Sequence, residues 1–221
     1  MSITIQAANT QLVAAPQRST TERLRDAIVR GDYAPNQRLI EADLSATLSA
    51  SRATIRTALL ALENEGLVER LPNKGSRVRA ISVDEAIEIL EVRIGIEGLC
   101  AAKSAESLTP DQAEDLLYLR SRMVESVADG DLVEYSGLNR LLDLRIRELS
   151  GHATASSVLA RLHAQSVRHQ FKLSSRPQRA KVSLGEHTAI IDAIVARDPE
   201  AAERSVRTHL RSVIAALRDI A

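Results

Sequence analysis

The sequence predicts a mainly α-helical protein in which an N-terminal winged helix-turn-helix is followed by an antiparallel bundle of six helices. Only 2% of the 221 residues are aromatic, so β-strands, which favour aromatic side chains, should be a minority. Apolar residues recur at helical spacing through most of the chain. Short breaks rich in Gly, Pro, Asp and Ser separate these stretches, and short loops are typical of helices that pack antiparallel.

Charge is unevenly distributed along a chain whose formal net charge is zero. Residues 1–80 carry eleven Lys and Arg against eight Asp and Glu, whereas the rest of the chain carries 18 against 21. A basic excess in one part of a protein is typical of a nucleic-acid-binding domain. The length allows a second domain with its own hydrophobic core.

The single cysteine, Cys100, excludes an intramolecular disulfide, and its neighbours Leu99 and Ala101 predict a core position. The sequence has no apolar run of about 18 residues, and its N-terminus lacks the pattern of a signal peptide. We therefore expect a cytoplasmic protein without membrane contact.

The first helix follows a segment with no sustained period. Residues 1–18 are expected to form a flexible N-terminal arm. Ser19 and Glu22 then form a capping-box pattern, which begins a helix that ends at Gly31. We expect the DNA-binding domain to span residues 19–80.

Residues 39–66 predict two short helices joined by a tight turn, around which the rest of the chain is organised. In the first helix, Ile40, Leu44 and Leu48 recur every four residues. Ser51 follows the break and is a good N-cap for the second helix.

The second helix of this pair has two distinct faces. Its apolar face consists of Ile55, Ala58, Leu59 and Leu62, and its polar face of Arg52, Ala53, Arg56 and Thr57. Because the basic and small residues crowd the N-terminal half, that end can enter the major groove of DNA, as a recognition helix does. The alternative is an ordinary helix pair with solvated arginines.

A short hairpin is predicted directly after the helix pair. Residues 67–71 and 76–79 form two strands around a turn that contains Asn and Gly, and the hairpin is expected to expose Lys74, Arg77 and Arg79. A basic hairpin after a helix-turn-helix is a wing, which can reach the adjacent DNA backbone or minor groove. The candidate DNA contacts are Ser51, Arg52, Ala53, Thr54, Arg56, Lys74 and Gly75.

These residues resemble the winged helix of the GntR family. The resemblance rests on Arg38, Leu39, Glu41 and Leu44, on residues 51–59, on Leu62, Glu63 and residues 65–68, and on Lys74, Gly75 and Val78. The sequence departs from the family pattern at Ala53 and Thr54, where a Thr-Pro pair is common, and at Thr57, which is often Glu. In the family those positions face the DNA groove, so the departures concern which operator sequence is recognised.

The second domain is expected to span residues 82–221. Its six helices are predicted over residues 83–105, 110–128, 131–149, 153–172, 178–195 and 199–219. A bundle of this kind offers a ligand pocket between its helices.

Three of these helices carry side chains that are common metal ligands. Asn139 and Asp143 lie four residues apart, so both project from the same face of their helix. His187 and His209 lie on two later helices. Together they could form part of a tetrahedral or octahedral metal site, although lone histidines on helices are more often surface or core residues.

The second domain resembles the FCD ligand-binding domain of the FadR branch of GntR regulators, and its six helices resemble the VanR group. The resemblance rests on residues 138–143, 150–151, 186–187, 190, 193–194, 198–199, 201–202 and 209. It implies a metal site in which Asn139, His187 and His209 take three of the four places. Asp143 stands where the family has His, which favours a hard ion such as Mg, Mn or Zn, with Ni a further candidate, or means that the metal has been lost.

The same resemblance places Arg93 on the first helix of the domain, facing a small carboxylic-acid effector. A buried arginine needs an anionic partner, and the alternative partner is Glu97, four residues later. His152, His163 and His169 match nothing in the pattern and are interpreted as structural or surface residues.

We expect a ligand-responsive regulator that binds a near-palindromic double-stranded DNA operator as a homodimer. The resemblance implies that it acts as a repressor. The dimer should form through the helix over residues 83–105, because its apolar residues exceed one buried stripe: Ile87, Leu90, Ile94 and Leu99. One alternative is a bundle that only dimerises. The other is a metal-dependent enzyme, which we do not expect because no general base lies beside the candidate ligands.

Overall fold

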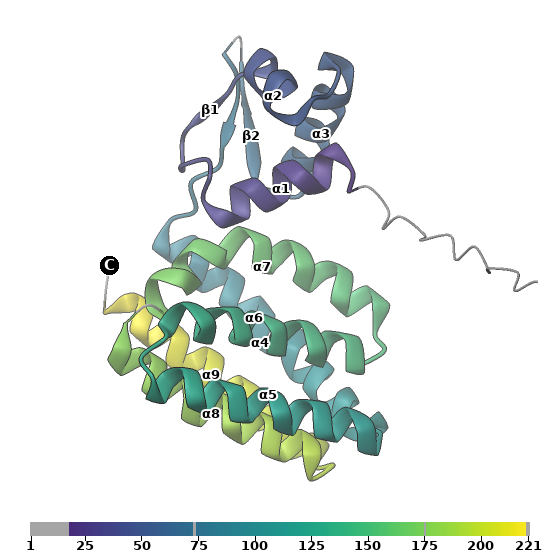
Figure 1. Ribbon diagram of the computed structural model, residues 1–221, viewed down its shortest axis with the longest axis vertical. Helices are drawn as coiled ribbons and strands as arrows, with labels where there is room; N and C mark the ends of the chain where they lie inside the picture. Colours follow the sequence, from purple (N-terminus) through teal and green to yellow (C-terminus); the bar gives the residue numbers. More distant parts are fainter. Residues whose placement is uncertain (1–17, 73, 175, 220–221) are drawn as a thin grey trace, which may run out of the picture.

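The computed structural model describes residues 18–72, 74–174 and 176–219, which form a small N-terminal part and a larger helical part (Figure 1). The small part contains α1 (Thr20–Arg30), β1 (Arg38–Leu39), α2 (Glu41–Leu48), α3 (Arg52–Asn64), β2 (Val68–Leu71) and β3 (Gly75–Val78). The larger part contains α4 (Val83–Ser107), α5 (Pro110–Ala128), α6 (Leu132–Leu149), α7 (Ala153–Ser174), α8 (Pro177–Val195) and α9 (Pro199–Arg218). The predicted fold class, a winged helix-turn-helix followed by a six-helix bundle, is confirmed. The arm expected over residues 1–18 lies outside the described residues except for Arg18.

Local capping sets the ends of the helices in the small part. The Ser19 side chain accepts a hydrogen bond from the backbone of Glu22, whose carboxylate in turn accepts from the backbone of Ser19. Gly31, at a φ of +93°, ends α1 in the left-handed conformation that glycine adopts without strain. Ser51 is the N-cap of α3, and its side chain accepts a hydrogen bond from the backbone of Thr54.

The sheet has three antiparallel strands in the order β1-β3-β2. The hairpin of β2 and β3 places Val68 opposite Val78 and Leu71 opposite Gly75. The third strand, β1, was not predicted, and Leu39 was wrongly assigned to the following helix. Two residues are too few to show the alternation by which a strand is predicted.

Each part has its own hydrophobic core. The core of the small part is formed by Leu24, Ile28, Leu39, Leu44, Leu48, Ile55, Leu59, Leu62, Leu67, Val68 and Val78. Ala164 of α7 packs against this core from the helical part. The two parts are therefore joined by packing as well as by the connecting chain.

The bundle core contains large side chains that are completely enclosed, including Tyr135, Met123 and Leu159. Cys100 lies in this core, as predicted. α7 lies between the winged helix and the rest of the bundle, whereas α5, α8 and α9 lie on the far side (Figure 1). None of the described helices is both long enough and apolar enough to span a membrane.

Candidate DNA-binding surface and effector pocket

The N-terminal half of α3 presents an exposed polar face. Ile55, Ala58, Leu59 and Leu62 are buried in the core, as predicted, whereas Ser51, Arg52, Ala53, Thr54, Arg56 and Thr57 are exposed. The helix is two-sided because its apolar residues recur every three to four positions and bury one face only. All the candidate DNA contacts on this helix therefore face solvent.

The two arginines of this face differ in their partners. Arg52 forms no hydrogen bond or ion pair with a described residue. Arg56 donates from Nε to the Glu41 carboxylate at 2.8 Å, but the Arg56 side chain is exposed and that of Glu41 is partly exposed. An exposed pair of this kind contributes little to stability, so Arg56 can exchange Glu41 for a phosphate or a base edge at low cost.

The wing tip is held by a contact from β1. Arg38 donates a hydrogen bond from Nη2 to the backbone oxygen of Lys74 at 2.7 Å, and both side chains are exposed. Gly75 has a φ of +79°, which a side chain would strain. The structure thus adds Arg38 as a residue that positions the wing, a role not predicted from the sequence.

Two arginines that the sequence predicted to be exposed on the hairpin are paired with carboxylates. Arg77 pairs with Glu69, directly opposite on β2, at 2.7 Å. Arg79 pairs with Glu85 of α4 at 2.5 Å. Both are only partly exposed, whereas Lys74 at the tip and Arg70 on β2 are exposed.

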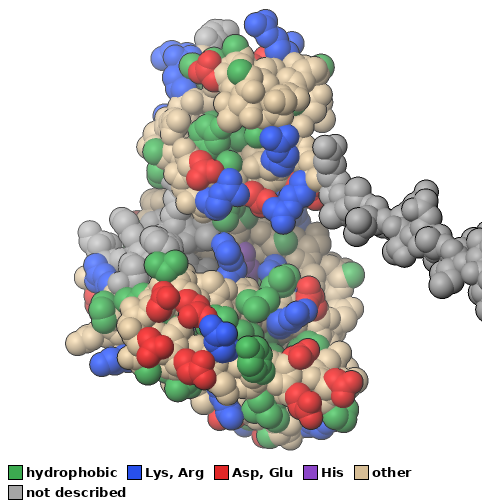
Figure 2. Space-filling model, in the orientation of Figure 1, with side chains coloured by type: hydrophobic (Ala, Val, Ile, Leu, Met, Phe, Trp, Pro, Cys, Tyr) green, Lys and Arg blue, Asp and Glu red, His purple; other side chains and the backbone are tan. Residues whose placement is uncertain are grey.

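The α3 helix and the β2–β3 hairpin lie at the end of the molecule that is remote from the bundle, where Lys and Arg side chains are prominent (Figures 1 and 2). Glu65, which follows α3, contacts α7 of the bundle through its backbone oxygen. A helix of 13 residues is about 20 Å long at 1.5 Å per residue. The N-terminal end of α3 therefore projects away from the helical part.

The bundle encloses two small adjoining hollows. The first has a free volume of about 30 Å³ and the second of about 20 Å³, which is room for one or two waters or an ion. Polar lining residues are Arg93, Asn139, Asp143, Ser166, Arg179, Ser183 and His209 in the first, and Glu97, Asp143, Arg147, His187 and His209 in the second. The structure thus brings together all five residues that the sequence assigned to metal and effector. The two hollows together are called the FCD pocket, after the domain that the bundle resembles.

Arg93 is 2% exposed and projects into the bundle. Its Nε donates to Glu97 at 2.6 Å and its Nη1 to the Ser166 hydroxyl at 3.1 Å. Burial favours the neutral form of Glu97, but the charges of Arg93 and His163 outweigh it and hold the pKa of this carboxyl well below its usual range. The alternative partner proposed from the sequence, Glu97, is therefore present.

The families that match this chain cover both of its parts. The family described as bacterial regulatory proteins, gntR family, matches residues 16–78, and the FCD domain matches residues 88–212. The chain belongs to the GntR family and carries an FCD domain. As predicted, it is a transcriptional regulator: the family and its relatives are regulators and not enzymes.

Relatives resemble this GntR-family protein over nearly its whole length. An uncharacterized HTH-type transcriptional regulator in an unstable DNA locus of Streptomyces ambofaciens is 30% identical over 193 residues, covering 86% of this chain and 80% of the relative. The HTH-type transcriptional repressor RspR of Escherichia coli is 25% identical, with 89% and 86% covered. The solved structure of E. coli McbR/YncC has the same fold, with a TM-score of 0.78 at 22% identity over 92% and 99% of the two chains.

His163, which the sequence predicted to be a structural or surface residue, contacts two acidic residues that line the pocket of this FCD domain. Its Nε2 lies 2.9 Å from Glu97 and its Nδ1 lies 3.6 Å from Asp143. The missed signal is spacing, because His163 falls four residues after Leu159 and three before Ser166, both of which are buried. His152, by contrast, accepts from the backbone of Ala155 near the start of α7 and is structural, while the side chain of His169 lies outside the described residues.

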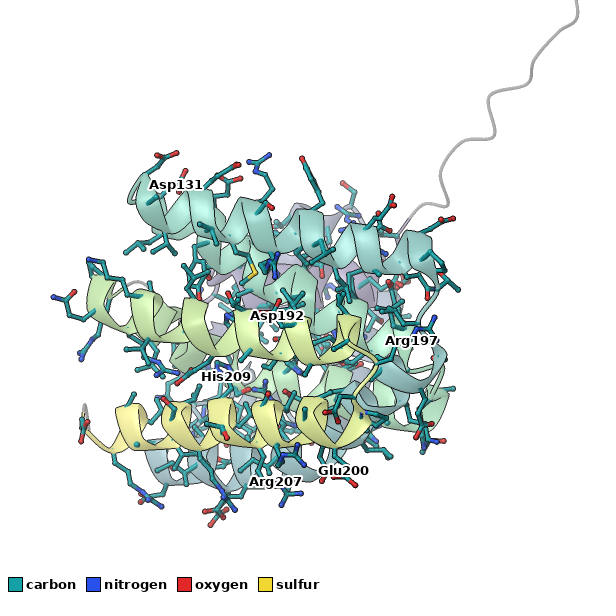
Figure 3. All side chains as sticks on the ribbon, turned by 90° about the horizontal axis from the view of Figure 1, so that it is seen from below. Asp131, Asp192, Arg197, Glu200, Arg207 and His209 are labelled. Atoms are coloured by element: carbon teal, nitrogen blue, oxygen red, sulfur yellow. The ribbon has the colours of Figure 1, made fainter. Side chains whose placement is uncertain are left out.

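The two predicted metal-binding histidines of the FCD domain lie side by side. Their ring centroids are 4.4 Å apart, and His209 projects from α9 towards α8 (Figure 3). Burial, with smaller effects from His209 and Arg179, lowers the pKa of His187 well below its ordinary value, so its ring is neutral. Nδ1 of His187 forms a hydrogen bond with the Tyr135 hydroxyl at 3.0 Å, so Nε2 is the ring nitrogen that remains for another partner.

Three buried atoms among the candidate ligands have no hydrogen-bond partner in the described part of the chain: Asn139 Oδ1, Asp143 Oδ2 and His187 Nε2. Unpaired buried polar atoms are costly, and all three are metal-ligand types. His209, however, directs Nδ1 to Glu186 at 2.7 Å. Within the described residues, no three His, Cys, Asp or Glu side chains are grouped closely enough to hold an ion. A metal would therefore need the Asn139 amide or a movement of His209.

Proposed function

We propose that this regulator is a repressor that binds a near-palindromic operator as a homodimer and that a small carboxylic acid in the FCD pocket changes this binding. The observation that carries the proposal is the exposed N-terminal half of α3, whose Arg52 has no partner among the described residues, together with the exposed wing residue Lys74. Relatives named as repressors, RspR and NanR, support repression as the direction of control.

Dimerisation is supported by apolar residues that the bundle leaves exposed. On α4, Leu90 is buried, but Val92 is 54% exposed and Leu99 is 40% exposed. Their spacing of seven residues places them on one face of the helix, with the partly buried Ile96 between them. One recognition helix reads only a few base pairs, so two copies are needed for a specific site.

The formal charges of the FCD pocket support a cation and an anion together. Three arginines, Arg93, Arg147 and Arg179, line it beside the carboxylates of Glu97 and Asp143. A divalent ion would add positive charge next to these carboxylates, and a carboxylate effector would then find both the ion and the arginines as partners. Arg93 and Arg179 reach the pocket from different helices, α4 and α8.

The proposed ligands of the ion are Asn139, Asp143, His187 and His209. Two neutral imidazoles with oxygen ligands suit zinc, manganese, magnesium or nickel, and the ion would offer an open position to a carboxylate oxygen. A free volume of about 30 Å³ admits an ion but not a carboxylic acid. The effector must therefore displace side chains or helices, which is how its binding could reach the DNA-binding part.

The DNA half of this proposal is tested by selecting duplexes from a random pool with the purified protein and footprinting the best of them. We expect two symmetric half-sites protected by a dimer. A footprint of one half-site, together with a monomer at micromolar concentration in light scattering, would contradict the proposal.

The metal is tested by elemental analysis of protein purified without a histidine tag and incubated with zinc, manganese or nickel. We expect about one ion per chain and its loss in His187→Ala/His209→Ala. Equal, near-zero metal in both proteins would remove the ion from the proposal. A screen of small carboxylic acids for release from the selected duplex would then decide between an effector site and a bundle that only dimerises.

A further inference from the structure

We infer that Gln165 of α7 is a positioning residue for the recognition helix, and that α7 transmits the state of the FCD pocket to it. Nε2 of Gln165 donates a hydrogen bond to the backbone oxygen of Glu65 at 2.6 Å. Glu65 is the C-cap of α3. A side chain of the effector-binding domain thus holds the end of the helix that is expected to read DNA. The regulatory part of this inference rests on the proposed function.

The contact is close because the chain has a glycine beside it. Gly66 has a φ of +73°, and a Cβ at this position would lie 2.4 Å from Nε2 of Gln165. Ala164, the preceding residue of α7, packs against the core of the winged helix. The contact therefore belongs to a packed interface rather than to an isolated surface hydrogen bond.

Glu65 is also held from its other side. Its carboxylate accepts two hydrogen bonds from the guanidinium of Arg25 in α1, both at 2.6 Å. Planar, two-point pairing fixes orientation better than a single contact does. The C-terminal end of α3 is therefore fixed between α1 and α7, and a shift of α7 will tilt the recognition helix relative to the bundle.

The opposite face of α7 contacts the FCD pocket. Ser166 is 3% exposed and accepts from Arg93, while His163 lies against Glu97 and Asp143. Residues three apart share a helix face, so His163 and Ser166 face the pocket while Ala164 and Gln165 face the winged helix. A ligand that displaces Arg93 or Asp143 changes the contacts of α7 within one helical turn of Gln165.

The direct test compares Gln165→Ala with Arg161→Ala, a matched control at an exposed position one turn earlier on α7. We expect backbone amides at residues 62–68 to exchange with deuterium about two- to tenfold faster in Gln165→Ala, as the loss of one hydrogen bond implies. Arg161→Ala should leave this segment unchanged. Unaltered exchange in Gln165→Ala would overturn the positioning role.

Transmission from the FCD pocket to α3 is tested by removing the hydrogen bond between Arg93 and Ser166, first at one partner and then at the other. Ser166→Ala removes the acceptor, and Arg93→Lys keeps a positive charge beside Glu97 but loses the nitrogen that reaches Ser166. We expect both variants to change exchange at residues 62–68, and the effect of each to shrink by at least half in the Gln165→Ala background. Equal effects in both backgrounds would show that α7 does not carry the signal through Gln165.

These exchange measurements need neither DNA nor effector, so they can fail independently of the proposed function. The same variants are then tested on the duplex selected by the wild-type protein. If the pocket variants alter its affinity only when Gln165 is present, the contact regulates DNA binding. If wild type selects no duplex, the proposed function fails while the structural coupling stands.

Discussion

The arginines of the recognition helix and those of the FCD pocket are the same residue type in opposite environments. Arg52 and Arg56 are exposed; Arg52 has no partner in the described part of the chain, and Arg56 has an exposed one-point pair with Glu41. Arg93 and Arg179 are buried or nearly so, and each has a carboxylate within 3 Å. The exposed pair can change partners with little cost to the fold. The buried pair can do so only if a new anion or a structural change compensates the carboxylates left behind.

The largest expected effect is a loss of stability when a buried arginine of the pocket is replaced. Arg93→Met leaves the Glu97 carboxylate buried without its main partner, so we expect the free energy of unfolding to fall by about 3 kcal/mol. Urea denaturation followed by circular dichroism measures this loss. Arg93→Met/Glu97→Met should recover part of it. If Arg52→Ala destabilises the protein as much as Arg93→Met does, the comparison between the two regions is wrong.

Replacing the exposed arginines of α3 is expected to have a smaller effect, which is on DNA affinity. Arg52→Ala should cost about 1–3 kcal/mol on the selected duplex, as expected for a lost guanine or phosphate contact. Arg56→Ala should behave similarly, and both should leave the free energy of unfolding unchanged. Fluorescence anisotropy titrations measure the affinity. Wild-type affinity in the double variant, with the fold intact, would refute the placement of the recognition helix.

The pocket also predicts a pH dependence through Glu97. Its pKa is lowered in the folded state, so its charged form stabilises the fold above the unfolded pKa near 4.5, and this contribution is lost as the pH falls further. Glu97→Gln, whose amide can still accept from Arg93, should lose less stability at neutral pH than Arg93→Met. The difference between wild type and Glu97→Gln should shrink below pH 4.5. A constant difference from pH 7 to pH 4 would argue against a charged Glu97.

The N-cap of α3 gives an effect of about 1 kcal/mol. Ser51→Ala removes the acceptor for the backbone of Thr54 and should lower the free energy of unfolding by that amount. Ser51→Asp should retain the cap and serves as its control for stability. If Ser51→Ala is as stable as wild type, the cap does not set the start of the helix.

The smallest effect is expected in the wing. Lys74→Ala should weaken binding less than Arg52→Ala, act alike on all DNA sequences and reduce the salt dependence of binding by about one ion. Titrations at several salt concentrations on selected and scrambled duplexes separate these outcomes. A loss confined to the selected duplex would instead assign Lys74 to base recognition.

The winged helix was largely predictable because its signals are local. Caps such as Ser19 and Ser51 and apolar residues three to four apart specify helices without knowledge of the rest of the fold. The short strand β1 gave no such signal. Arg77 was expected to be exposed, although the hairpin register places Glu69 directly opposite it, a pairing that strand alignment could have predicted.

The FCD pocket was predictable only in part because its contacts join residues far apart in the sequence. Resemblance to the family found Arg93, Asn139, Asp143, His187 and His209, which the structure brings together. It could not find His163, whose role depends on how α7 packs against α4 and α6. Gln165 was missed for the same reason, since its partner lies 100 residues away.

The small free volume of the FCD pocket also has a kinetic consequence. The pocket has room for only one or two waters, so a carboxylic acid can enter it only after side chains or helices have moved. The observed association rate should therefore level off at high ligand concentration, at the rate of this opening. The apparent affinity is likewise reduced by the fraction of molecules that are open. A stabilised, tightly closed variant would therefore bind the effector more weakly even with every ligand-contacting residue in place.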